Sequence, residues 1–163
     1  MIRIGQAGIP LSCKGRTNKD GIVYTHKSLD LNAIEIQFVR GLYVLSEEEA
    51  LFIKEYAQNN DIEIHVHAPY YLNLAGEREE ITMSYEKIMK SALMANNIGS
   101  KTLIIHPGYY GENNPKKTAK LITKNAKKII AMFKKEKLKV RLAMETMGKQ
   151  KVFGSLDEII EVC

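Results

Sequence analysis

The sequence contains only two cysteines, no tryptophan and no long run of apolar residues. Cys13 and Cys163 lie far apart, without the spacing of a metal-binding or redox motif, which predicts reduced thiols in a cytoplasmic protein. No segment approaches the roughly 18 consecutive apolar residues that a membrane-spanning helix needs, so we expect no membrane partner. The opening residues, MIRIGQAGIPL, lack the basic and apolar regions of a signal peptide.

The net charge of +5 is unevenly distributed. Nine lysines and one glutamate fall between Pro115 and Lys137, so this segment carries +8 and the remainder of the chain −3. Within the segment Ile122, Ala126 and Ile129 recur at helical spacing, which predicts a helix with one buried side. We interpret the lysines as its solvated face, so charge alone does not identify a partner.

The chain, with 163 residues of which 45% are hydrophobic, is long enough for one domain with a core. We therefore expect residues 1–163 to form a single domain. Strand-like and helix-like segments alternate along it. The predicted strands are 2–8, 33–39, 62–68, 101–108 and 140–146, and the predicted helices are 23–29, 46–58, 84–97, 115–137 and a last one starting after Ser155.

This alternation indicates an α/β fold with parallel strands joined by helical crossovers. An open doubly wound sheet and a barrel both fit the order of elements. The first strand is not followed by G-x-G-x-x-G, which disfavours the dinucleotide-binding version of the open sheet. A complete (β/α)₈ barrel takes about 250 residues. As a barrel, the chain would supply about the first five β-α units.

Ligand-type residues stand at the ends of three successive predicted strands. His67, His106 and Glu145 end the third, fourth and fifth strands, where parallel α/β folds collect their chemistry. Alternation along each strand puts the three on one face. Two imidazoles and a carboxylate suit zinc and leave a position open for water. His65 lies one layer deeper, and we expect it to support a ligand or to hydrogen-bond within the barrel.

Four motifs identify a family that the chain resembles. Four segments are similar to the endonuclease IV family, most closely its archaeal type. They are EIQFVRG around the second predicted strand, HAPYYLNLA after the third, HPGYYG after the fourth and ETMGKQKVFGSLDEI after the fifth. The resemblance covers the chain from Ile2 to its last residue. It implies a TIM barrel with three zinc ions that takes part in base-excision repair, cleaving the DNA phosphodiester 5′ to an abasic site.

The resemblance also implies roles for single residues. His67 and His106 match the imidazole ligands of one zinc ion, and Glu145 matches the catalytic carboxylate shared between that ion and a second one. Ions held in this way lower the pKa of a bridging water and neutralise charge on the phosphate. The family takes its other zinc ligands from later strands. The 163 residues therefore hold one complete zinc site and part of a second, and we expect them to be inactive alone.

The expected partner is damaged double-stranded DNA. Tyr70 matches the aromatic residue that enters the duplex at the lesion, and Arg40 matches a basic residue that contacts the strand there. Lys14 and Arg16, in the loop after the first strand, are candidates for phosphate contacts because they flank the site. For the neighbouring Tyr71 we expect packing onto the barrel rim.

Two other functions remain open. Sugar isomerases and epimerases of the xylose-isomerase-like barrels also place histidine and glutamate around a divalent metal, but the aromatic pair beside Arg40 fits a DNA groove better. The second of these functions is that of a half barrel that binds DNA or a partner and catalyses no reaction. A half barrel leaves open strand edges and exposes apolar interior. We therefore expect the chain to be a piece of a longer protein, and self-association through those edges is the alternative for a chain this short.

Overall fold

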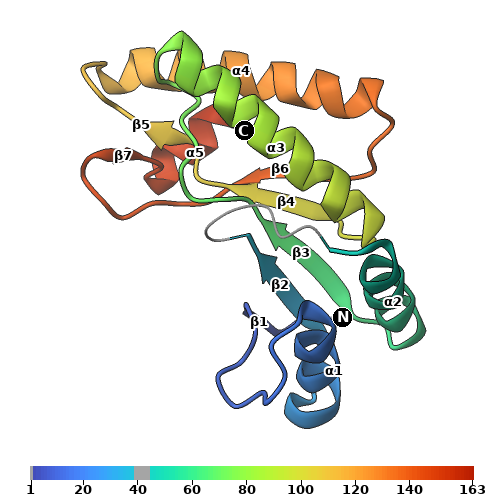
Figure 1. Cartoon of the computed structure of the whole chain (residues 1–163). Coiled ribbons are helices and arrows are strands. Elements are labelled where there is room, and N and C mark those ends of the chain that lie inside the picture. Colours follow the sequence, from blue (N-terminus) through green and yellow to red (C-terminus); the bar gives the residue numbers. More distant parts are fainter. Residues whose placement is uncertain (1, 39–44) are drawn as a thin grey trace.

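The computed structural model of the chain describes residues 2–38 and 45–163. Its main sheet has five strands in the order β1-β2-β3-β4-β6, and all neighbours pair in parallel (Figure 1). The predicted alternation is confirmed, because parallel neighbours need a crossover between them. The strands are β1 (Gly5–Ala7), β2 (Ala33–Gln37), β3 (Glu63–His67), β4 (Thr102–Ile105) and β6 (Arg141–Met144).

Helices α1 to α4 cover one face of this curved sheet, and α5 packs against α4 (Figure 1). The other face is left to the strands and to the loops that leave their carboxyl ends. The helices are α1 (Asn18–Leu29), α2 (Glu47–Asn59), α3 (Arg78–Asn97), α4 (Pro115–Lys135) and α5 (Leu156–Val162).

Two helices begin earlier than the apolar spacing predicted. The Thr17 hydroxyl accepts a hydrogen bond from the Asp20 N–H, and the Asp20 carboxylate accepts one from the Thr17 N–H, so α1 starts at Asn18. In α3, the Glu80 carboxylate accepts the Glu77 N–H at 3.0 Å, and the helix starts at Arg78. Acidic first turns favour these starts because they complement the helix dipole.

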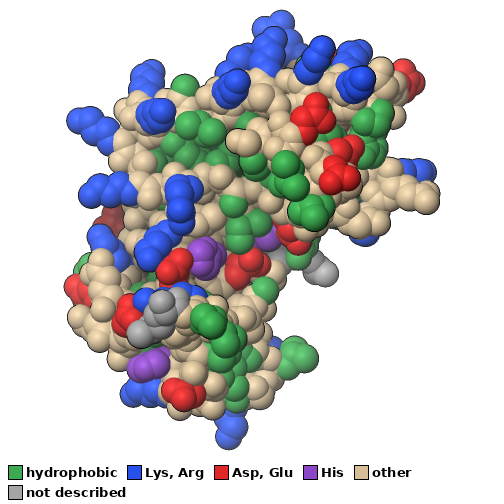
Figure 2. All heavy atoms as spheres, turned by 180° about the vertical axis from the view of Figure 1, so that it is seen from behind, with side chains coloured by type: hydrophobic (Ala, Val, Ile, Leu, Met, Phe, Trp, Pro, Cys, Tyr) green, Lys and Arg blue, Asp and Glu red, His purple; other side chains and the backbone are tan. Residues whose placement is uncertain are grey.

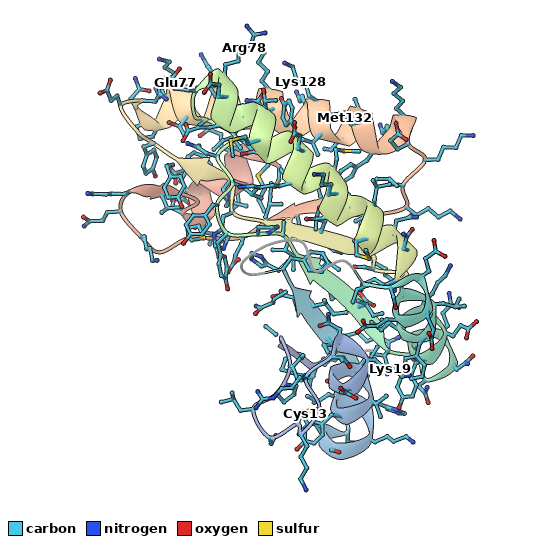
Figure 3. The ribbon with its side chains drawn as sticks, in the orientation of Figure 1. Cys13, Lys19, Glu77, Arg78, Lys128 and Met132 are labelled. Carbon is cyan, nitrogen blue, oxygen red and sulfur yellow. The ribbon has the colours of Figure 1, made fainter. Side chains whose placement is uncertain are left out.

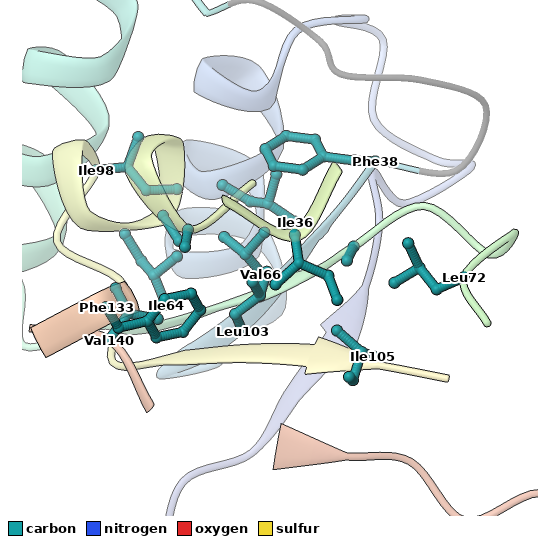
Figure 4. Close-up of a cluster of buried hydrophobic side chains, with 14 of the residues drawn as sticks. Ile36, Phe38, Ile64, Val66, Leu72, Ile98, Leu103, Ile105, Phe133 and Val140 are labelled. Carbon is teal, nitrogen blue, oxygen red and sulfur yellow. The ribbon is translucent and has the colours of Figure 1, made fainter. Parts of the chain in front are cut away.

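Apolar residues at alternate positions of the strands form the core beneath the helices (Figure 4). Ile36, Val66, Leu103 and Ile105 are each no more than 1% exposed. Burying a side chain of this size contributes about 1.5–3 kcal/mol. Because strand side chains alternate between faces, this burial fixes the intervening residues on the opposite, concave side of the sheet.

The concave side is polar and open to solvent. Glu35, Gln37 and His65 are only partly buried there, and Figure 2 shows histidine and acidic side chains gathered at the waist of the molecule on this side. Within the described residues, β1 and β6 each pair along one edge only. The apolar Ile2 and Ile4 near β1 are 80% and 60% exposed. Self-association through these edges stays a prediction.

A small antiparallel pair of strands was not predicted from the sequence. β5 (Gly108–Tyr109) and β7 (Val152–Phe153) pair beside the carboxyl ends of β4 and β6 (Figure 1). The Tyr110 hydroxyl donates to the Glu158 carboxylate at 2.7 Å, which ties this pair to the start of α5. That bond, together with burial, raises the pKa of Tyr110 to about 12. α5 begins at the Ser155–Glu158 capping box, as predicted.

The remaining features lie on the periphery. Lys128 projects from α4 at one end of the molecule, and Cys13 and Lys19 lie at the other, around α1 (Figure 3). All eight lysines of α4 are exposed, which agrees with a solvated face. Cys13 is a buried free thiol and Cys163 an exposed one. None of the helices in the described ranges has the length and apolar character needed to cross a membrane.

Leu103 tests the assignment of the core face. Replacing this fully buried side chain (Leu103→Ala) leaves a cavity under α3, so we expect a loss of about 2–5 kcal/mol in the free energy of unfolding, measured by urea denaturation. Leu93→Ala is the matched control, because Leu93 is 45% exposed and its truncation should change that free energy by about 0.5 kcal/mol or less. Equal losses in both variants would contradict the assignment.

Candidate metal centre

The parallel register brings three strand ends together. His67 is the last residue of β3, while His106 and Glu145 directly follow β4 and β6. His67 pairs with Ile104, and Ile104 pairs with Ala143. His106 lies two residues after Ile104, and Glu145 lies two residues after Ala143. Both therefore fall on the same concave face as His67, one step further toward the mouth of the barrel.

The three side chains meet at one carboxylate oxygen. Oε2 of Glu145 lies 2.7 Å from Nε2 of His67 and 3.0 Å from Nε2 of His106. One ligand atom from each residue lies within 4.8 Å of the others. Tetrahedral zinc with bonds of about 2.1 Å would hold its ligand atoms about 3.4 Å apart. The two distances to Oε2 of Glu145 are shorter than this by 0.4–0.7 Å, so a small shift of the carboxylate away from the imidazoles would make room for an ion.

The hydrogen bonds of His67 select the nitrogen that a metal would use. Its Nδ1 lies 2.7 Å from the carbonyl oxygen of Ala68, which can only accept, so Nδ1 carries the proton. Nε2, which lies 2.7 Å from Oε2 of Glu145, is then the nitrogen left for a metal ion. A carbonyl behind a metal-binding imidazole has this same orienting effect. His67 is 4% exposed, so its ring has little freedom to turn away.

The electrostatics of the cluster favour the protonation states that bind metals. Burial and the neighbouring His67 lower the pKa of His106, against the opposing charge of Glu145. For Glu145, burial favours the protonated acid, but hydrogen bonds and charge from both imidazoles outweigh it and lower the pKa. At neutral pH Glu145 is therefore an ionised carboxylate and His106 a neutral imidazole.

Tyr70 covers the two imidazoles. Its ring stacks on His106 at 5.1 Å between centroids and meets the ring of His67 edge-on at 5.4 Å. The adjacent Tyr71 is 76% exposed, so the expectation that it packs onto the rim is wrong. The β3–α3 loop thus presents one ring held against the cluster and one ring directed into solvent.

The other predicted site residues lie away from the cluster or beyond the described part of the chain. Nε2 of His65 lies 3.3 Å from a carboxylate oxygen of Glu63, and no described contact joins His65 to the cluster. Lys14 and Arg16 are exposed in the loop between β1 and α1. Arg40 lies outside the described residues. The roles assigned to these four residues stay predictions.

Sequence reasoning gave no role to Asn73. Its side-chain oxygen accepts hydrogen bonds from the N–H groups of Ala75, at 3.1 Å, and Tyr109, at 3.2 Å. The first bond is an Asx turn, which an asparagine in a loop two residues before Ala75 could have suggested. The second depends on how the chain folds back on itself, and no local pattern carries it.

The sequence is similar to curated proteins of several organisms. An uncharacterized protein of Methanocaldococcus jannaschii is 37% identical over 164 residues, which cover 100% of this chain and 58% of that protein. A probable endonuclease 4 of Aster yellows witches'-broom phytoplasma is 30% identical over 169 residues, which cover 95% of this chain and 56% of the relative. The chain thus spans a little under three fifths of the length of these curated relatives.

Two solved structures share the fold. The endonuclease IV of Thermus thermophilus superimposes with a TM-score of 0.67 and 22% identity, over 91% of this chain and 54% of that one. A D-tagatose 3-epimerase-like protein gives a TM-score of 0.72 and 22% identity, over 98% of this chain and 60% of that one. At these identities the likeness speaks for architecture.

A family model described as Xylose isomerase-like TIM barrel matches residues 24–163. The predicted fold class is confirmed, since the five-stranded parallel sheet is part of such a barrel. The predicted resemblance to endonuclease IV agrees with the relatives named probable endonuclease 4. The chain belongs to the family of xylose isomerase-like TIM barrels.

Proposed function

We propose that the chain is the N-terminal part of a metal-dependent nuclease of DNA base-excision repair, which hydrolyses the phosphodiester 5′ to an abasic site. One observation carries the proposal: His67, His106 and Glu145 meet within hydrogen-bonding distance at the carboxyl edge of a TIM-type sheet. The relatives named probable endonuclease 4 support nuclease chemistry. The chain spans 58% of the length of the Methanocaldococcus jannaschii relative, so the activity is proposed for the whole protein.

The donor set fits zinc. His67 and His106 would each offer Nε2, and Glu145 would offer a carboxylate oxygen. Bound zinc lowers the pKa of a coordinated water and stabilises charge on a phosphate. The described contacts of Glu145 with the imidazoles use Oε2, so Oε1 can hold a second ion. We propose that the other ligands of a three-zinc centre come from outside residues 1–163, which form a single-domain portion of the barrel.

The proposed partner is damaged duplex DNA at the mouth of the barrel. Tyr70 lies on the imidazoles, so a sugar-phosphate bound at the metal would touch its ring. Arg40, Lys14 and Arg16 are the proposed contacts to the DNA backbone. A DNA substrate suits the cytoplasmic location that we predict.

A sugar epimerase is the second candidate function. The D-tagatose 3-epimerase-like structure matches 98% of this chain, and epimerases share the fold. A small polyol needs an enclosed pocket, whereas the Tyr71 ring, next to Tyr70 on the same loop, is 76% exposed. We therefore favour a large substrate. A non-catalytic half barrel that binds DNA or a second copy of the chain is the remaining alternative.

Metal binding is tested by His67→Ala. Zinc titrated against a chelating dye should bind the unmodified protein, and the variant should lose at least about 100-fold in affinity. Removing a group that only hydrogen-bonds a metal ligand already lowers metal affinity about 10–100-fold. His26→Ala is the matched control, because His26 pairs with Tyr56 on α2, away from the cluster, and should leave affinity unchanged. Equal zinc affinity in both variants would refute the assignment.

The reaction is tested on the intact parent protein. It should nick a duplex that carries an abasic site, leave an undamaged duplex whole and lose activity with a chelator. Glu145→Gln should slow nicking by about 100-fold or more, because the carboxylate charge and a bridging oxygen are lost. Activity on a free ketose without nicking would establish the epimerase instead.

Tyr70→Ala tests the contact of the ring with the lesion. If Tyr70 stacks within the duplex, its loss should weaken binding to abasic DNA by about 5–150-fold, corresponding to 1–3 kcal/mol per stacked base, and binding to intact DNA much less. Fluorescence anisotropy with both duplexes measures this difference. Tyr71→Ala is the matched control on the same loop, and a larger effect there would transfer the role to Tyr71.

A further inference from the structure

The β3–α3 loop begins directly after His67 and carries Tyr70, and Asn73 ties it to the segment that follows β4. Oδ1 of Asn73 accepts the Tyr109 N–H at 3.2 Å, across to β5. The adjacent Leu74 N–H donates to the Pro107 carbonyl at 3.0 Å. Two hydrogen bonds therefore join this loop to the three residues that directly follow His106.

Gly108 leaves space for this contact. A Cβ on Gly108 would lie 2.6 Å from Oδ1 of Asn73, closer than a side chain can approach, and 3.1 Å from the Leu74 nitrogen. Its φ of +145° is also a conformation that residues with side chains rarely adopt. The approach of Asn73 to this segment thus depends on glycine at position 108.

The loop is also held from behind. The Asn73 N–H donates to the Ser84 hydroxyl at 2.9 Å on α3, and the Leu74 carbonyl accepts from the Asn125 side chain at 2.7 Å on α4. Asn125 is 4% exposed and accepts in turn from the Tyr85 hydroxyl at 2.6 Å. Asn73 therefore connects a rigid support to the β4–β5 segment rather than joining two mobile loops.

We infer that Asn73 is a positioning residue that sets the distance between the two imidazole ligands. It touches neither imidazole, and it acts by fixing the backbone that follows each of them. The inference rests on the proposed metal centre. Metal affinity depends on ligand positions held within about 0.5 Å, so loosening one ligand segment against the other should weaken binding without removing a ligand.

Asn73→Ser separates this role from simple folding. Serine can keep the local turn to the Ala75 N–H but is too short to reach Tyr109. We expect zinc affinity to fall by about 10–100-fold, measured by competition with a chelating dye on protein shown to be folded by circular dichroism. Asn73→Asp keeps the accepting oxygen, and Glu80→Gln in the same variant avoids a pair of carboxylates, because the Asn73 amide nitrogen lies 3.5 Å from Oε2 of Glu80. This double variant should restore affinity to within about threefold of the unmodified protein.

Asn113→Ala is the matched control. Asn113 donates to the Ala75 carbonyl of the same loop at 3.4 Å but makes no described bond to Tyr109, so its loss should change affinity by less than about threefold. Zinc affinity unchanged in Asn73→Ser, or equally weak in the double variant Asn73→Asp with Glu80→Gln, would overturn the inference. Failure of the unmodified protein to bind zinc would overturn the metal centre itself, a separate outcome.

Discussion

The register of β3, β4 and β6 is the constraint on which the candidate site depends. Parallel pairing aligns the carboxyl ends of these strands, and side-chain alternation decides which residues face the mouth. A slip of one residue in β4 would turn His106 toward the helices and Leu103 toward solvent. The apolar contacts under α3 and α4 therefore determine the chemistry on the opposite side of the sheet, although none of those residues can bind a metal or a phosphate.

Much of the architecture could be predicted because it is encoded locally. The strands carry buried residues with a period of two, and the caps at Ser46 and Ser155 mark helix starts within four residues of sequence. The convergence of His67, His106 and Glu145 followed from the same periodicity, since parallel strands end at a common edge. That the three bind metal is a further step, which periodicity does not supply.

The features that were missed depend on contacts between distant segments. β5 and β7 have two residues each, too few for a periodic pattern, and they exist because their segments meet. The exposure of Tyr71 follows from Tyr70 occupying the space over the imidazoles, and two adjacent tyrosines in a loop look alike in sequence. The bond between Asn73 and Tyr109 likewise joins residues 36 positions apart.

Pairing of Val152–Phe153 with Gly108–Tyr109 has a consequence for the order of folding. Glu145 lies between β6 and β7, so its backbone is restrained on both sides only after the chain has returned from α4 to pair with β5. The two imidazoles lie 39 positions apart, as do His106 and Glu145, but both imidazoles precede Glu145 in the chain. During synthesis, the imidazole pair would thus assemble first, and the carboxylate would complete the cluster as one of the last local events.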